Sequence, residues 1–248
     1  MDIALTVVLS VMIFALGSVV GSFLNVVAYR VPRKESLIKG RSHCTTCGKR
    51  ILNRDLIPVF SWIFLRGKCR FCKSRISAQY MTVELITGLS YLAAYLALGV
   101  TVELAYAIVL FPLLMTLSLW DFERKEIPYA CSISIAVLGV VSFFTAQMPW
   151  YEHLIGAAII AVPFAVLAFL GAMGGGDVQL MAAAGLLLGW SIIPAAMIGI
   201  VLGAIFGIIV KAMTKHNLIC FGPFLSVGIA AGYLFGSDII NAYLGLIR

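Results

Sequence analysis

Long stretches without a charged side chain constrain this sequence more than any other feature. Residues 3 to 29 contain no Asp, Glu, Lys or Arg, and a helix needs about 20 apolar residues to cross the hydrocarbon core of a bilayer. Further uncharged stretches cover residues 85 to 102, 104 to 120, 127 to 151 and 154 to 176. Only 12% of the residues are charged, whereas soluble domains average about 25%. The sequence therefore predicts an all-α polytopic membrane protein.

The number of spans depends on residues 178 to 210, which form one more uncharged stretch. A single helix of this length would measure about 50 Å, well beyond a hydrocarbon core of about 30 Å. Gly189-Trp190-Ser191 and Pro194 predict a turn that divides it into two shorter helices. With a last span at about 221 to 240, the sequence predicts about eight transmembrane helices. One tilted helix over 178 to 210 would reduce the number to seven.

Positive charge is concentrated in one segment and indicates the topology. Thirteen of the 18 Lys and Arg residues lie between Arg30 and Arg75, and basic loops stay in the cytoplasm. This predicts a first transmembrane helix at 1–30, a cytoplasmic loop at 31–79, and a helical membrane bundle at 80–248. The net charge of +7 is thus explained by topology, and the expected partner is the lipid bilayer, with no nucleic acid.

Four cysteines in the predicted cytoplasmic loop form two CxxC pairs. They are Cys44, Cys47, Cys69 and Cys72, and their spacing is close to that of four-cysteine zinc ribbons. Disulfides are the alternative, but cytoplasmic thiols stay reduced. The pattern predicts a small zinc-ribbon-like insert. A closed site with four thiolates leaves no position for water, so this zinc would be structural.

Two aspartates stand where uncharged stretches end, and the predicted topology puts both on the cytoplasmic side. Asp121 opens a polar segment, and Asp177 follows three glycines, Gly174, Gly175 and Gly176. Carboxylates at membrane depth are first candidates for catalysis or an ion path. Two close carboxylates share a proton, so that one activates water and the other donates a proton, as in aspartic proteases. The glycines would let an extended peptide approach the pair closely.

Helix polarity suggests a division of roles between the two aspartates. Asp121 ends its predicted helix, where the partial negative charge opposes ionisation, whereas Asp177 begins a helix, where ionisation is favoured. We therefore expect Asp177 to be the ionised base and Asp121 the protonated acid.

Six motifs in the same order resemble those of bacterial type IV prepilin peptidases, which are GxGD-type membrane aspartic proteases. The aspartate segments resemble the DxxxxxIP and GxGD motifs of that family. The other four are Gly21-Ser22-Phe23-Leu24-Asn25-Val26-Val27, Ile57-Pro58-Val59-Phe60-Ser61-Trp62 with Leu65-Arg66-Gly67-Lys68-Cys69-Arg70, Val83-Glu84-Leu85 and Phe221-Gly222-Pro223-Phe224-Leu225.

The resemblance implies a bifunctional enzyme of the bacterial cytoplasmic membrane. Such an enzyme removes the basic leader of type IV prepilins and pseudopilins after a glycine, and then methylates the new N-terminus with S-adenosylmethionine. It implies that Asp121 and Asp177 are the peptidase pair. Asn25 and Glu84 match family motifs and are candidates for cofactor binding, although hydrogen bonding between helices explains them equally well.

Two other classes of function remain open at this point. Paired aspartates also suit an ion-coupled transporter or channel, although the four-cysteine loop then has no explanation. A noncatalytic assembly scaffold would use the loop and the glycine-rich helix faces as docking surfaces. It predicts that replacing either aspartate by asparagine leaves function intact.

Overall fold

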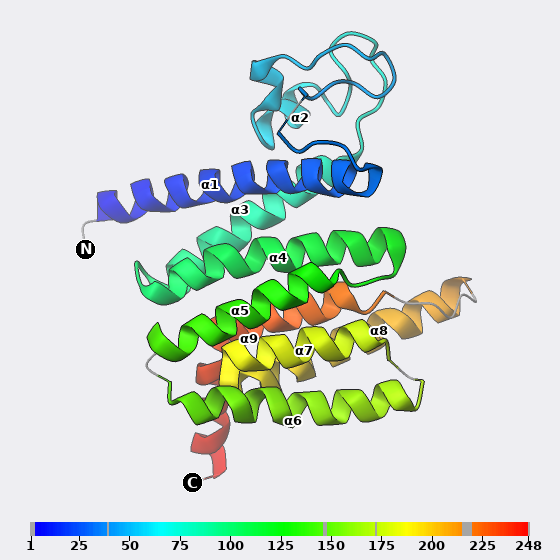
Figure 1. Cartoon of the computed structure of the whole chain (residues 1–248). Helices are drawn as coiled ribbons and strands as arrows, with labels where there is room; N and C mark the ends of the chain where they lie inside the picture. Colours follow the sequence, from blue (N-terminus) through cyan, green and yellow to red (C-terminus); the bar gives the residue numbers. More distant parts are fainter. Residues whose placement is uncertain (1–2, 39, 146–147, 172, 215–219, 248) are drawn as a thin grey trace. The chain divides into compact units, whose positions relative to one another are not determined.

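The protein is built from helices in every part that the structure describes. This computed structural model describes residues 3–38, 40–145, 148–171, 173–214 and 220–247, and these contain no β-strand. The long helices are α1 (Ile3–Arg30), α3 (Ala78–Leu98), α4 (Val102–Arg124), α5 (Tyr129–Thr145), α6 (Trp150–Phe169), α7 (Gly175–Leu188), α8 (Ile192–Thr214) and α9 (Gly222–Ile247) (Figure 1). A short helix, α2 (Phe60–Phe64), lies in the loop between α1 and α3.

The helices confirm the predicted polytopic membrane protein. Six stretches of the described residues are long and apolar enough to cross a membrane. One of them, Gly175–Met213, is divided by a 3₁₀ turn at Gly189–Ser191 into α7 and α8. Gly189 has a φ of 55°, a conformation that glycine adopts without steric cost. With the shorter apolar helix α5, the described residues contain eight apolar helices, and the predicted division of residues 178 to 210 is confirmed.

The chain divides into two compact units, Met1–Gly99 and Val100–Arg248. The boundary between the units follows α3, which packs against α1 in the first unit. The second unit contains α4 to α9, and both aspartates of the predicted pair belong to it.

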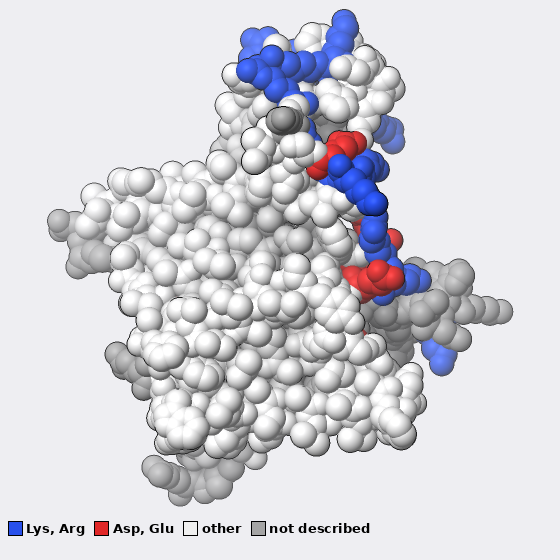
Figure 2. Space-filling view, viewed as in Figure 1, with Lys and Arg blue, Asp and Glu red and all other residues white. Residues whose placement is uncertain are grey.

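Glycines bring α1 and α3 of the first unit into backbone contact. A Cβ atom at Gly17 would lie 2.8 Å from the carbonyl oxygen of Thr87, and one at Gly21 would lie 2.8 Å from the Cα of Glu84. Helices in lipid associate through such close packing because burial of apolar surface drives little association there. Apart from Arg30 at the end of α1, the Lys and Arg side chains of this unit lie in the loop that connects these helices, where Figure 2 shows a concentration of positive charge.

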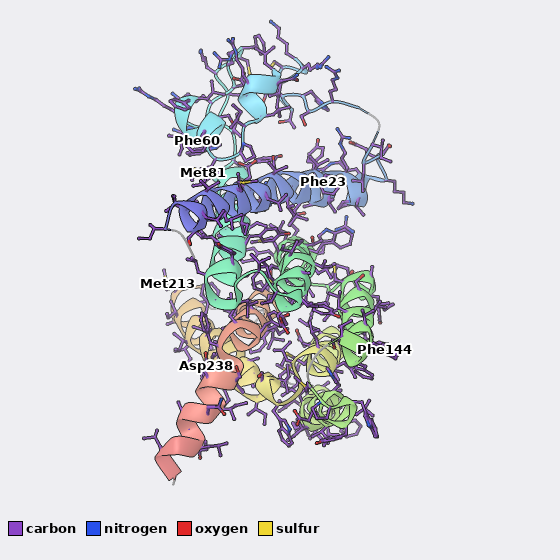
Figure 3. The ribbon with its side chains drawn as sticks, turned by 90° about the vertical axis from the view of Figure 1, so that its left-hand side faces the viewer. Phe23, Phe60, Met81, Phe144, Met213 and Asp238 are labelled. Atoms are coloured by element: carbon purple, nitrogen blue, oxygen red, sulfur yellow. The ribbon has the colours of Figure 1, made fainter. Side chains whose placement is uncertain are left out.

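In the second unit, α7 packs between neighbours and is therefore well fixed. It contacts α5, α6 and α9. A Cβ at Gly185 of α7 would lie 2.6 Å from the carbonyl oxygen of Gly156 in α6. Outward side chains are apolar, as for Phe144 on the outer side of α5 (Figure 3), which is 84% exposed. Such a surface suits contact with lipid chains.

A buried histidine contacts a backbone carbonyl group in the last turn of α7. The turn at Gly189 ends the helix, so carbonyl groups in its last turn lack helical partners. His153 of α6 is fully buried, and its Nδ1 lies 2.7 Å from the carbonyl oxygen of Leu186. This contact ties α6 to α7, the helix whose first turn contains Asp177.

Candidate active site and metal centre

Asp121 lies in the last turn of α4 and is buried against the start of α9. Only 6% of the residue is exposed. Its Oδ2 accepts a hydrogen bond of 2.9 Å from the backbone N–H of Gly222, the first residue of α9. The two residues are 101 positions apart in the sequence, so the tertiary fold creates this contact.

Asp177 lies in the first turn of α7 and is also buried, with 8% exposed. Its Oδ2 accepts a hydrogen bond of 3.2 Å from the backbone N–H of Gly174. Acidic side chains in the first turn of a helix satisfy free N–H groups and interact favourably with the helix dipole. The carboxylate is therefore fixed at the helix N-terminus, as the sequence indicated.

The fold brings the segments around the two aspartates together. A Cβ at Gly176, directly before Asp177, would lie 3.0 Å from the Cβ of Ile127, which belongs to the polar segment that Asp121 opens. The carboxylates of Asp121 and Asp177 interact electrostatically. Two buried acids thus stand at the ends of apolar helices, on segments that contact each other.

The three glycines before α7 differ in what surrounds them. Gly176 packs on Ile127, and a Cβ at Gly174 would lie 3.3 Å from the Oδ2 of Asp177. A Cβ at Gly175 would meet no atom of the described residues within 4 Å. Gly175 thus faces open space beside Asp177, where a second chain could approach.

Gly222 is the residue of this site that the sequence analysis missed. A Cβ at Gly222 would lie 2.8 Å from the Oδ2 of Asp121, so only glycine fits there without displacement. The ring of the preceding residue, Phe221, packs on Gly203 of α8 and fixes the start of α9. The Phe221-Gly222-Pro223 motif was visible in the sequence, but its contact with Asp121 was not.

The start of α9 also removes the reason for assigning separate roles to the aspartates. The separate roles were predicted from the C-terminal end of α4 alone, whose partial negative charge opposes ionisation of Asp121. The N-terminal end of α9, with the N–H of Gly222, acts on the same carboxylate in the opposite sense. Each aspartate therefore has one backbone N–H donor and one helix N-terminus.

The four loop cysteines converge on one point. All four Sγ atoms lie within 4.8 Å of one another, and Cys44 and Cys72 have their sulfur atoms 3.8 Å apart. Four sulfurs bound tetrahedrally at about 2.3 Å from zinc stand about 3.8 Å from each other. The cluster therefore has the dimensions of a four-thiolate metal site.

Two similar turns present these cysteines. In the first, the N–H of Gly48 donates to the carbonyl oxygen of Cys44, and in the second the N–H of Lys73 donates to that of Cys69. Gly48 and Lys73 both have positive φ angles. The predicted zinc-ribbon-like insert is confirmed in its arrangement, with two isolated β-bridges beside the turns in place of strands.

Local hydrogen bonds favour the thiolate form that a metal requires. The backbone N–H of Cys47, followed by the hydroxyl of Ser74, lowers the pKa of the Cys44 thiol to about 5. The hydroxyl and backbone N–H of Ser74 also lower the pKa of Cys72. The pKa of Cys47 is instead raised to about 11, because the backbone N–H of Lys49, which lowers it, is outweighed by desolvation and by hydrogen bonds with Cys72 and Cys44. Thiolates bind zinc and thiols do not, so Cys44 and Cys72 are suited to metal binding at neutral pH, while Cys47 would release its proton when the metal binds.

A cavity of about 500 Å³ lies in the first unit, between the cysteine loop and the adjoining ends of α1 and α3. Both residues that the resemblance suggested for cofactor binding, Asn25 and Glu84, line it. The Nδ2 of Asn25 donates to the carbonyl oxygen of Tyr80, so this side chain also links α1 to α3. Tyr29 and Trp62 contribute aromatic surface. The volume falls in the range of small-molecule sites.

Comparison with known proteins follows the same division into two parts. A model of the Bacterial Peptidase A24 N-terminal domain matches residues 15–98, and one of the Type IV leader peptidase family matches residues 108–209. A Prepilin leader peptidase/N-methyltransferase of Bacillus subtilis (strain 168) is 32% identical over 239 residues, which cover 94% of this chain and 96% of the relative. The chain belongs to the type IV leader peptidase family. Its N-terminal match includes Asn25, Glu84 and the cysteines, and the other includes both aspartates.

Further leader peptidases extend the comparison. A Prepilin leader peptidase/N-methyltransferase of Myxococcus xanthus (strain DK1622) is 36% identical over 218 residues, covering 83% of this chain and 64% of the relative. A "Type 4 prepilin-like proteins leader peptide-processing enzyme" of Escherichia coli O78:H11 is 32% identical over 247 residues, covering 88% of this chain and 91% of the relative. No solved structure is significantly similar to the chain.

Proposed function

We propose that this leader peptidase cleaves prepilins with Asp121 and Asp177 as one catalytic pair. The observation that carries the proposal is that two buried carboxylates, each bound by a backbone N–H, interact electrostatically on segments that contact each other. Burial of an acid at membrane depth costs free energy, so acids that are found there generally mark functional sites. Their location within the Type IV leader peptidase match adds to this support.

The pair would hydrolyse a peptide bond by general acid–base catalysis. Two close carboxylates retain one shared proton. The ionised carboxyl accepts a proton from water as the water attacks the scissile carbonyl carbon, and the protonated carboxyl donates to the carbonyl oxygen and later to the leaving amine. Because each aspartate has one N–H donor and one helix N-terminus, the proton belongs to the pair and not to one residue.

The membrane would deliver the substrate to this pair. A type IV prepilin or pseudopilin is expected to lie in the bilayer by its own apolar helix, with its basic leader in the cytoplasm. The membrane would be the bacterial cytoplasmic membrane. By the positive-inside rule, the cysteine loop and both aspartates would lie on its cytoplasmic side. The open face of Gly175 would accept the extended peptide beside Asp177, with Gly174 and Gly176 fixing that turn. Such positioning lowers the entropic barrier to cleavage.

The cysteine cluster would bind one structural zinc ion. Cys44, Cys47, Cys69 and Cys72 supply four thiolates at suitable separations, and a closed site of this kind stabilises a fold without reacting. Zinc would hold together a loop that has little secondary structure of its own, and that loop forms one wall of the cavity.

The cavity of the first unit would hold S-adenosylmethionine for N-methylation of the new N-terminus. When bound, this donor supplies a methyl group on a positively charged sulfur. Asn25 would contact the donor, Glu84 lines the same cavity, and the rings of Tyr29 and Trp62 offer surfaces for an adenine ring or a sulfonium. The N-methyltransferase names of the relatives support this second activity.

Prepilin cleavage by the full chain in lipid nanodiscs tests the peptidase proposal. We expect Asp121→Asn and Asp177→Asn each to lower the single-turnover rate by roughly 10²- to 10⁴-fold. Asp238→Asn is the matched control, because Asp238 lies exposed on α9 (Figure 3). This variant should cleave at the wild-type rate. Normal cleavage by either dyad variant would refute the proposal and favour a scaffold, while proton or cation flux without substrate would favour a transporter.

A further inference from the structure

The two acids that line the cavity of the first unit differ in their partners. Asp55 pairs with Arg70 through two hydrogen bonds of 2.6 and 2.8 Å. Glu84 is 8% exposed, and among the described residues it forms no salt bridge. A buried carboxylate without a cationic partner is unfavourable. Arg30, Lys49 and Arg75 also line the cavity, but among the described residues none of them forms a salt bridge with Glu84. Glu84 is therefore available to a cationic ligand.

The loop fixes the orientation of Glu84. Its Oε2 accepts a hydrogen bond of 2.7 Å from the backbone N–H of Val59. Val59 has φ 64° and ψ −57°, which is an outlier for a β-branched residue. Outliers of this kind persist where the surrounding structure holds them, and they cluster at functional sites. The bond engages Oε2, and no described residue forms a hydrogen bond with Oε1, which can therefore accept one from a ligand.

We propose that Glu84 binds the α-ammonium group of the methyl acceptor, the newly formed N-terminus of the pilin, and accepts its proton. The inference rests on the proposed methyl transfer and gives Glu84 a more specific role than cofactor binding. An α-amino group has a pKa near 8 and is mostly protonated at neutral pH. A protonated amine has no lone pair for attack, so methyl transfer needs a group that binds it and removes the proton.

With Glu84 as the base, methyl transfer to the pilin N-terminus proceeds in two parts. One N–H bond of the ammonium breaks and its proton goes to the carboxylate of Glu84. The neutral amine attacks the donor's methyl carbon, a carbon–nitrogen bond forms, and the carbon–sulfur bond breaks with its electron pair remaining on sulfur. The methylated nitrogen carries the positive charge that the sulfur had. Glu84 then releases its proton to water.

The test measures binding of synthetic peptides with a mature pilin N-terminus to the purified full chain. One peptide has a free α-amine and the other is N-acetylated. We expect wild type to bind the free amine better, and Glu84→Gln to weaken that binding by roughly tenfold or more while binding the acetylated peptide equally. The glutamine keeps an oxygen for the N–H of Val59. Glu35→Gln is the control, because Glu35 is exposed in the same unit and does not line the cavity.

Two further measurements distinguish the ammonium from the sulfonium. Glu84→Gln should bind S-adenosylmethionine, and S-adenosylhomocysteine with its neutral sulfur, as wild type does. It should still cleave prepilin, but the product mass should lack the methyl group. Selective loss of S-adenosylmethionine binding would assign Glu84 to the sulfonium, and an equal loss of both ligands would assign it to the amino-acid part of the donor; either result would overturn the proposal.

Equal binding of the two peptides by wild type would also overturn it, and this comparison needs no variant to fold. Absence of methylation by wild type in all conditions would instead refute the proposed methyl transfer itself.

Discussion

Replacing Gly222 by alanine should impair cleavage through Asp121 without touching the substrate. The added Cβ would lie 2.8 Å from the Oδ2 of Asp121 and 3.1 Å from its Cγ, so the carboxylate must move away from the N–H of Gly222. A hydrogen bond to a charged group contributes about 1.5–3 kcal/mol. Losing it from the transition state corresponds to a decrease of roughly 10- to 150-fold in kcat.

The assay is single-turnover cleavage of a prepilin in nanodiscs, with kcat and KM measured separately under steady-state conditions. The fall should appear in kcat with KM nearly unchanged. Gly245→Ala is the control on the same helix, because a Cβ there meets no atom within 4 Å. If Gly222→Ala cleaved at the wild-type rate, the contact between α9 and Asp121 would have no part in catalysis.

Three further predictions concern the glycine turn, the metal and one ion pair. Gly175→Ala should raise the KM for prepilin with an unchanged melting temperature, since its Cβ meets open space; an unchanged KM would argue against a peptide lying there. Elemental analysis should give close to one zinc per chain, lost in Cys44→Ser, and a value near zero in reduced, chelator-free protein would contradict the metal site. Arg70 lowers the pKa of Asp55, so the ionised form stabilises the fold above pH ~4 and this contribution disappears as the pH falls further. The melting temperature of Asp55→Asn should therefore differ from wild type mainly above pH ~4, and a difference that persists at lower pH would contradict the ion pair's role.

The sequence was informative where the deciding signal is local. Uncharged stretches of fixed length predict helices in any membrane protein, and the turn at Gly189 was visible in its glycine. The cysteine cluster followed from two equal CxxC spacings, because each pair fixes its own turn. The position of Asp177 at a helix N-terminus was likewise a property of four consecutive residues.

Contacts between segments that are distant in the sequence could not be predicted from it. The N–H of Gly222 reaches Asp121 only because α9 returns to the end of α4, and the sequence argument about helix polarity therefore considered one helix end of two. The bond from Val59 to Glu84 depends on how the loop folds over α3. The packing of α3 on α1 depends on Gly17 and Gly21, whose spacing occurs in many apolar helices.

A double-substitution experiment tests most directly whether Asp121 and Asp177 act as one pair. Single-turnover cleavage rates would be measured for Asp121→Asn, Asp177→Asn and the variant that carries both. Residues that act as a unit in catalysis are strongly non-additive, so the double variant should cleave about as slowly as the slower single variant. Independent contributions, in which the two rate losses multiply, would contradict the shared-proton pair.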